Sequence, residues 1–321
     1  MILTIVLFVV GFVILTFGAN WLVEGASTIA KRFNVSDLVI GLTVVAFGTS
    51  APELVVNVVS SIEGDAEIAI GNVVGSNIFN ILFILGVSAI IFPLTVRSNT
   101  IWKEIPLSLL SALVLLFVSN DIFLDNRGPN EIGFIDGLVL LSFFVIFLYY
   151  MLDLAKKDSK NESISDQKNT PIWKPLLFIG SGLTGLILGA RWIVNGAVEI
   201  AGLAGISESV IALTIVAAGT SLPELATSVV AAYRRNVDIA IGNIVGSNIF
   251  NIFLILGISS LIKPLPLSVN SNFDIGMVVF ASLLLLLFIF TGKGRQISRM
   301  EGGIFIICYC AYLYYLIFPF I

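Results

Sequence analysis

The sequence predicts an all-α polytopic membrane protein with ten transmembrane helices, arranged as two inverted-topology repeats of five helices each. Of its 321 residues 57% are hydrophobic and 12% are charged, and its mean hydropathy is +1.03, well above the range of a soluble domain. The apolar runs are near 20 residues long and continuous, which favours spanning helices over the alternating strands of a barrel. Related motifs also occur in both halves of the chain at a constant offset.

The ten expected segments are connected by loops whose basic residues are unevenly distributed. Of the 17 Lys and Arg residues, 14 lie in the odd-numbered connections, which places these loops in the cytoplasm and both termini outside a plasma membrane. The first segment lacks a basic leader and a cleavage site, so we expect a spanning helix there and not a signal peptide. The expected segments are 2–26, 36–61, 68–94, 104–120, 131–153, 174–197, 208–232, 238–263, 272–291 and 300–320.

The two halves are copies of one another, related by an offset of 171 residues. Between residues 68–86 and 239–257, 16 of 19 positions are identical. Because each copy holds an odd number of helices, the second enters the membrane from the opposite side, which gives a pseudo-two-fold axis in the membrane plane. We therefore expect a first repeat at 1–152, a polar cytoplasmic linker at 153–173 and a second repeat at 174–321.

One duplicated motif puts a carboxylate into each apolar half. The sequence GTSAPEL, residues 48–54, returns as GTSLPEL, residues 219–225. Glu53 and Glu224 each follow a proline, which interrupts a helix, and a carboxylate at membrane depth is costly enough to indicate a function. A two-fold axis brings equivalent residues together, so we expect these two carboxylates to meet near the membrane midplane.

The chemistry of this motif indicates a site for a hard cation. Proline and glycine should deprive nearby carbonyls of their amide partners, and hydroxyls lie beside them. An oxygen-only cage of this kind suits Ca²⁺ and also Na⁺. The chain has no histidine, and Cys308 and Cys310 would point to different faces of a helix, so zinc and copper are disfavoured. The carbonyls concerned belong to Ala46, Thr49, Ala217 and Thr220.

A second duplicated motif, GNxxGSNxxN, adds a polar stripe to one helix of each half. It begins at Gly71 and at Gly242. Small and amide residues at such spacing often only allow close helix packing. Because the stripe is duplicated and follows a matched Pro-Glu each time, we favour a shared ion site, with the other copy's carboxylate as the partner of the stripe. The stripe residues are Asn72, Ser76 and Asn80, with Asn243, Ser247 and Asn251 in the second half.

The paired motifs resemble the α1 and α2 repeats of the Ca²⁺:cation antiporter superfamily, in particular the prokaryotic sodium/calcium exchangers. The resemblance covers essentially the whole chain. It implies that Ca²⁺ is bound by Glu53 and Glu224 with the carbonyls of Thr49 and Thr220. It also implies Na⁺ sites that share these carboxylates, with Asn80 and Asn251 completing the centre. The further Na⁺ ligands implied are Ser50, Ser221, Ser76, Ser247 and the carbonyls of Ala46 and Ala217.

One position departs from part of that superfamily. Some prokaryotic exchangers and the potassium-dependent branch carry Asp where this chain has Asn251, so the present site offers two carboxylates and not three. Ca²⁺/H⁺ exchange and K⁺-dependent exchange therefore remain alternatives to Na⁺/Ca²⁺ exchange. We expect no prosthetic group, because Ca²⁺ and Na⁺ would be cargo.

Glycines recur at spacing seven in the first and sixth helices, as Gly11, Gly18 and Gly25 and their mates Gly182, Gly189 and Gly196. Such a stripe is consistent with close packing, and equally with the sliding of these helices across the bundle that the resemblance implies. We expect Arg191 to reach the outer surface and Glu24 the inner one, as anchors.

Other classes of protein fit the sequence less well. An intramembrane enzyme could use two carboxylates as an acid/base pair, but the sequence offers no nucleophile with a base partner. A cation channel could use a ring of Glu residues, but such rings normally come from several subunits. The small net charge of −4 and the scattered basic residues disfavour nucleic acid. We expect a non-enzymatic protein that acts as a monomer in lipid.

Overall fold

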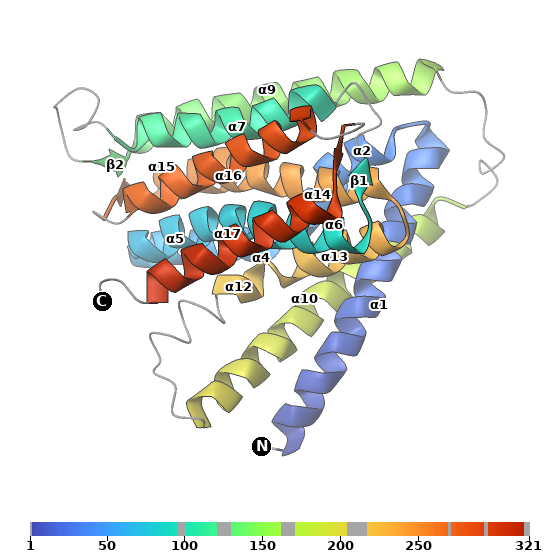
Figure 1. Cartoon of the computed structure of the whole chain (residues 1–321), viewed down its shortest axis with the longest axis horizontal. Coiled ribbons are helices and arrows are strands. Elements are labelled where there is room, and N and C mark those ends of the chain that lie inside the picture. Colours follow the sequence, from blue (N-terminus) through green and yellow to red (C-terminus); the bar gives the residue numbers. More distant parts are fainter. Residues whose placement is uncertain are drawn as a thin grey trace.

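The computed structural model describes residues 2–95, 101–120, 130–161, 171–203, 217–268, 271–291 and 295–317, and these are almost entirely helical (Figure 1). Among them, six helices are long and apolar enough to span a membrane, or seven if one bent pair counts as a single span. The coarse prediction of an all-helical, multi-pass membrane protein is therefore confirmed. The predicted segment 208–232 begins outside the described residues.

The Pro-Glu motif lies where a helix breaks. In the first half α2 (Asp37–Ile40), the π-helical turn η1 (Gly41–Val45) and α3 (Ala46–Thr49) are followed by α4 (Ala51–Glu63), and the two parts are bent by 46°. In the second half α12 (Ala217–Thr220) precedes α13 (Leu222–Tyr233). The residue at each break has nearly the same conformation, with φ −80° and ψ 6° at Ser50 and φ −87° and ψ 7° at Ser221.

The second motif lies on the two helices that follow. A tight turn at Gly64, with φ 87°, leads into the first of these helices. The equivalent turn of the second half leads into the second helix. Both helices continue through a π-helical stretch and are largely buried. They are α5 (Ala66–Ile78), η2 (Phe79–Ile84) and α6 (Leu85–Ile91), and then α14 (Val237–Ile249), η5 (Phe250–Leu256) and α15 (Gly257–Ile262).

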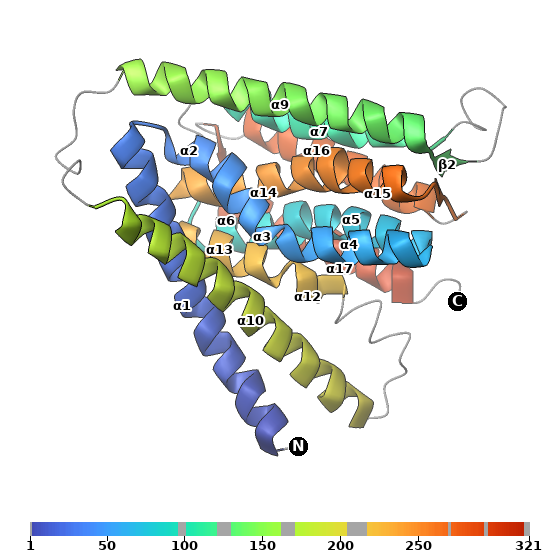
Figure 2. The same ribbon diagram turned by 180° about the vertical axis from the view of Figure 1, so that it is seen from behind.

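Four further helices lie around this core. They are α7 (Ile101–Val118), α9 (Phe134–Asn161), α16 (Ser271–Thr291) and α17 (Arg299–Ile317), and α9 runs along one edge of the molecule (Figure 2). The helix α9 continues to Asn161, so the predicted linker at 153–173 begins as helix. Two antiparallel strand pairs each join one half to the other: β1 (Leu94–Thr95) with β4 (Gln296–Ile297), and β2 (Glu131–Ile132) with β3 (Leu265–Pro266).

The helices α1 (Ile2–Phe33) and α10 (Trp173–Leu203) lie side by side, inclined to the other helices in both views (Figures 1 and 2). Their glycines bring the two backbones together. A Cβ atom on Gly18 would lie 2.8 Å from the Gly182 carbonyl oxygen, and one on Gly189 would lie 2.8 Å from the Gly11 carbonyl oxygen. Close packing is thus what these four glycines serve in this structure, and it joins α1 to α10.

Candidate ion-binding site

The two carboxylates of the Pro-Glu motif are buried in the core, each 1% exposed, and the serines at the helix breaks connect them across the two halves. The Ser50 hydroxyl donates to Oε1 of Glu224 at 3.1 Å. The Ser221 hydroxyl donates to Oε1 of Glu53 at 3.0 Å. The carboxylate of each half is therefore held by the helix break of the other half.

The threonines beside these serines make a second pair of contacts between the halves. The Thr49 hydroxyl donates to Oδ1 of Asn243 at 3.0 Å, and the Thr220 hydroxyl donates to Oδ1 of Asn72 at 3.2 Å. Each of these asparagines also donates its amide to the backbone carbonyl of the carboxylate residue in its own half, at 3.4 Å. Asn72 of α5 and Asn243 of α14 therefore each hydrogen-bond to the helix breaks of both halves.

Four asparagines further along the same two helices hydrogen-bond to one another at the centre of the cluster. The Asn80 amide donates to Oδ1 of Asn248 at 2.9 Å, and the Asn251 amide donates to Oδ1 of Asn77 at 3.0 Å. Asn77 and Asn248 belong to the second motif but were not among the predicted site residues. Their duplication within GSN was the signal that could have identified them.

Four buried oxygens in this cluster accept no hydrogen bond from any residue that the structure describes. They are Oε2 of Glu53, Oε2 of Glu224, Oδ1 of Asn80 and Oδ1 of Asn251. Within the described residues, neither carboxylate forms an ion pair with a basic side chain. A buried charge without a partner is costly. All four atoms are hard oxygen acceptors, so this set of donors suits a hard cation such as Ca²⁺ or Na⁺.

The remaining predicted ligands lie in or beside the same cluster. The Ser247 hydroxyl donates to Oε1 of Glu224 at 3.4 Å, and the Ser76 hydroxyl lies 3.0 Å from that of Ser221. Ala217 is the first residue of α12, at the break of the second half.

Two expectations about this cluster are wrong in detail. The carbonyl of Ala46 is not freed, because the break comes later and the Ser50 amide still donates to that carbonyl at 2.9 Å. The polar stripe was expected to meet the other copy's carboxylate, but Ser247 contacts Glu224 of its own half. The serines at the two breaks contact the other half's carboxylate instead, because the bend turns them toward the opposite repeat.

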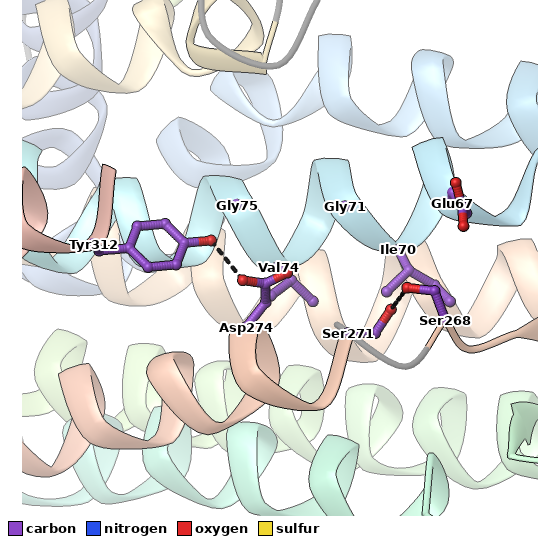
Figure 3. A pocket seen from close by; sticks show the side chains of 9 residues that line it. All are labelled: Glu67, Ile70, Gly71, Val74, Gly75, Ser268, Ser271, Asp274 and Tyr312. Carbon is purple, nitrogen blue, oxygen red and sulfur yellow. Dashed lines mark hydrogen bonds between the residues drawn. The ribbon is translucent and has the colours of Figure 1, made fainter. Parts of the chain in front are cut away.

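A separate cavity of about 280 Å³ lies on the other face of α5, where α16 and α17 approach it (Figure 3). Its lining includes Glu67 and Asp274, and Figure 3 shows the Tyr312 hydroxyl pointing toward Asp274, to which it donates at 2.9 Å. None of the predicted ion ligands lines this cavity. The carboxylate cluster is thus distinct from it and is enclosed by protein.

An enclosed pair of carboxylates among broken helices, inside an apolar helical bundle, is the kind of site found in membrane transporters of ions. A family model described as "Sodium/calcium exchanger protein" matches residues 3–152 and 174–318, which is most of the chain. The chain belongs to the sodium/calcium exchanger family.

Individual relatives are similar over nearly their whole length. The sodium/calcium exchanger MaX1 of Methanosarcina acetivorans is 36% identical over 340 residues, covering 94% of this chain and 95% of the relative. The inner membrane protein YrbG of Escherichia coli K12 is 34% identical and is covered to 98%, as is this chain. A solved structure of the sodium-calcium exchanger NCX_Mj superposes with a TM-score of 0.84 at 37% identity, over 97% of this chain and 98% of the other.

Proposed function

We propose that this protein is a secondary active antiporter that exchanges Ca²⁺ for Na⁺ across a membrane by alternating access. The observation that carries the proposal is the group of four buried acceptor oxygens on Glu53, Glu224, Asn80 and Asn251. Two carboxylates would balance the charge of one Ca²⁺ ion. Membership of the family, and the description of MaX1 and NCX_Mj as sodium/calcium exchangers, support Na⁺ as the counter-ion.

We assign the roles of the site residues by their position in the cluster. Glu53 and Glu224 would bind Ca²⁺ directly, with the carbonyls of Thr49 and Thr220, and the same carboxylates would take part in binding Na⁺. Asn80 and Asn251 would supply neutral amide oxygens at the centre. Further oxygens for Na⁺ would come from Ser50, Ser76, Ser221, Ser247 and Ala217, and from the carbonyl of Ala46, which also accepts from the Ser50 amide.

We further propose ten membrane crossings in two inverted repeats, 1–152 and 174–321, joined by a cytoplasmic linker at 153–173. The reciprocal hydrogen bonds of the two breaks support a two-fold relation between the halves. The excess of basic residues in the odd-numbered connections supports termini outside the plasma membrane. A single chain contains both carboxylates, so a monomer would suffice for transport.

The experiment that tests this function is ⁴⁵Ca²⁺ uptake into proteoliposomes loaded in turn with Na⁺, with K⁺ or with a proton gradient. We expect saturable uptake that requires an outward Na⁺ gradient. Uptake driven equally well by protons would indicate Ca²⁺/H⁺ exchange instead. Uptake only with K⁺ present would indicate K⁺-dependent exchange. Uptake that needs no counter-ion gradient would indicate a channel.

A further inference from the structure

A stripe of polar side chains holds one end of α1 to the bundle. Asn20, Glu24 and Ser27 lie on one face of α1, at spacings of four and three, and they face the turn that joins α13 to α14. In this turn, Nε of Arg234 donates to Oδ1 of Asn20 at 3.0 Å, and its Nη1 lies 3.7 Å from Oε2 of Glu24. The amide of Asn236 donates to the Ser27 hydroxyl at 2.8 Å.

The conformation of this turn explains how it can hold α1. Arg235 has a left-handed backbone, with φ 61°, so the turn is tight. Asn236 caps α14 by accepting from the Ile239 amide at 3.2 Å, which leaves its side-chain nitrogen to bind elsewhere. That nitrogen also donates to Oδ2 of Asp37 at 2.7 Å. One residue therefore ties together α1, α2 and α14.

The repeat offset identifies the equivalent groups in the other copy. Subtracting 171 converts Arg234 and Asn236 into Glu63 and Asp65, in the turn between α4 and α5, and adding 171 converts Asn20 into Arg191 on α10. Asp65 caps α5 by accepting from the Ile68 amide, as Asn236 caps α14. We call the Arg234 turn with α1 the first end, and the Glu63 turn with α10 the second end. The two ends are built alike, but their charges are exchanged.

At each end, the charge of the turn remains complementary to the charge of the facing helix, although the signs are exchanged. At the first end the turn carries the guanidinium, and α1 offers an amide oxygen and a carboxylate. At the second end the turn carries the carboxylates Glu63 and Asp65, and α10 offers the guanidinium of Arg191 and the amide of Asn195. An Arg facing carboxylates on a turn is a favourable arrangement in either direction.

Among the described residues, only the first end is engaged. Apart from its contact with α10, the helix α1 packs against α13, α2 and η1, and α10 packs against α13, α12 and α3. Arg191 and Glu63 are both exposed, and no ion pair joins them among the described residues. Lys263, at the end of α15, lies against Gly64 of the second turn. The molecule is therefore asymmetric, although its two sequence repeats are matched.

We propose that these two ends are alternating locks of the transport cycle, and that Arg191 pairs with Glu63 when the contacts of Arg234 with α1 are broken. The inference rests on the proposed antiport. In the conformation described here, the Arg234 lock closes the inner end of the site. When α1 and α10 shift together, the Arg191 lock forms and closes the outer end.

The modest strength of such a contact suits this role. An exposed ion pair contributes little to stability, so it can be broken in every cycle without trapping either conformation. Removing it should change the balance between conformations by only about two- to fivefold. A much stronger contact would slow the change from one conformation to the other.

Disulfide cross-linking tests this proposal directly. The native Cys308 and Cys310 are first replaced by serine, and a protease site is placed within residues 162–170, so that cleavage separates the two halves unless a cross-link joins them. The R191C/E63C pair is then oxidised in proteoliposomes, with N20C/R234C as the matched pair for the conformation described here. We expect both pairs to cross-link, and any change of ions that increases one to decrease the other.

The possible outcomes separate this inference from the proposed function. If N20C/R234C cross-links and the cysteine-free parent exchanges ions, but R191C/E63C never cross-links, the second lock does not exist. If both pairs cross-link but the parent shows no exchange, the locks stand and the proposed function fails.

Charge reversal gives an independent readout of the same lock. E63R should slow exchange by about two- to fivefold, since it faces Arg191 with a like charge. The double variant R191E/E63R should restore the rate, because the pair is rebuilt with reversed polarity. A double variant that is no faster than E63R alone would contradict the proposal.

Discussion

The Ser50 hydroxyl donates to the carboxylate of Glu224 at 3.1 Å, so the helix break of the first half holds the ion-binding group of the second half. Its mate, Ser221, holds Glu53 in the same way. A bend that looks like a local consequence of proline is thus a link between the repeats. Both carboxylates are oriented by residues 168 and 174 positions away in sequence.

Replacing Ser50 or Ser221 by alanine should weaken Ca²⁺ binding while the protein still folds. Groups that orient a direct ligand typically contribute about 10- to 100-fold to metal affinity. We expect a rise of that order in the Ca²⁺ concentration that half-saturates uptake, measured with ⁴⁵Ca²⁺ in Na⁺-loaded proteoliposomes. Ser142→Ala is the matched control, because among the described residues the Ser142 hydroxyl bonds only to the Leu138 carbonyl of its own helix. An unchanged half-saturation in both site variants would show that the cross-half bonds do not orient the carboxylates.

Asn251→Asp should give the transporter a dependence on an additional monovalent cation. The side chain is 1% exposed and its Oδ1 accepts no hydrogen bond from the described residues, so a third carboxylate there would leave the Ca²⁺-loaded site with an uncompensated negative charge. We expect Ca²⁺ uptake by this variant to respond to added K⁺ or to external pH where the parent does not. Asn80→Asp tests whether the equivalent position in the first half behaves alike. If uptake by Asn251→Asp changes with neither K⁺ nor pH, the assignment of the Asn251 Oδ1 atom to the ion site is contradicted.

Gly18→Val should destabilise the protein by separating α1 from α10. The first added carbon would lie 2.8 Å from the Gly182 carbonyl oxygen and from the Leu186 backbone nitrogen, and backbone atoms cannot move aside as a flexible side chain can. Overpacking of this kind costs about 1–3 kcal/mol. Thermal unfolding of the detergent-solubilised protein should therefore begin at a lower temperature. Gly180→Ala is the control on α10, because a Cβ there meets no atom of the described part of the chain within 4 Å. If the two variants unfold at the same temperature, the glycine contact is not a packing constraint.

Much of the fold and of the site followed from the sequence because the sequence repeats itself. The offset that relates Glu53 to Glu224 predicts that they meet, and the structure connects both to the same cluster through Ser221 and Ser50. Hydropathy gives the approximate extents of the helices. It cannot give the true ends, because the polar turns of α1 through Phe33 and of α9 through Asn161 remain helical beyond the apolar run.

Other features could not be predicted, and for physical reasons. The repeats say which residues are equivalent but not which contacts are formed, so the engagement of Arg234 with α1, while Arg191 and Glu63 remain exposed, is a property of one conformation. The roles of Asn77 and Asn248 depended on which face of α5 meets α14. The proline rule also misplaced the break relative to Ala46, because a proline removes one amide and the bend can be taken up at a neighbouring residue.

The most direct test of the central claim compares Glu53→Gln, Glu224→Gln and the parent in Na⁺-gradient-driven ⁴⁵Ca²⁺ uptake. Each substitution keeps the shape of the side chain but removes one of the two charges that would balance Ca²⁺. Glu67→Gln, in the separate cavity beside α5, is the control for the loss of a carboxylate as such. We expect both site variants to fold and elute as the parent does but to lose Ca²⁺ uptake, while Glu67→Gln retains it. Near-normal uptake by either Glu53→Gln or Glu224→Gln would contradict this expectation.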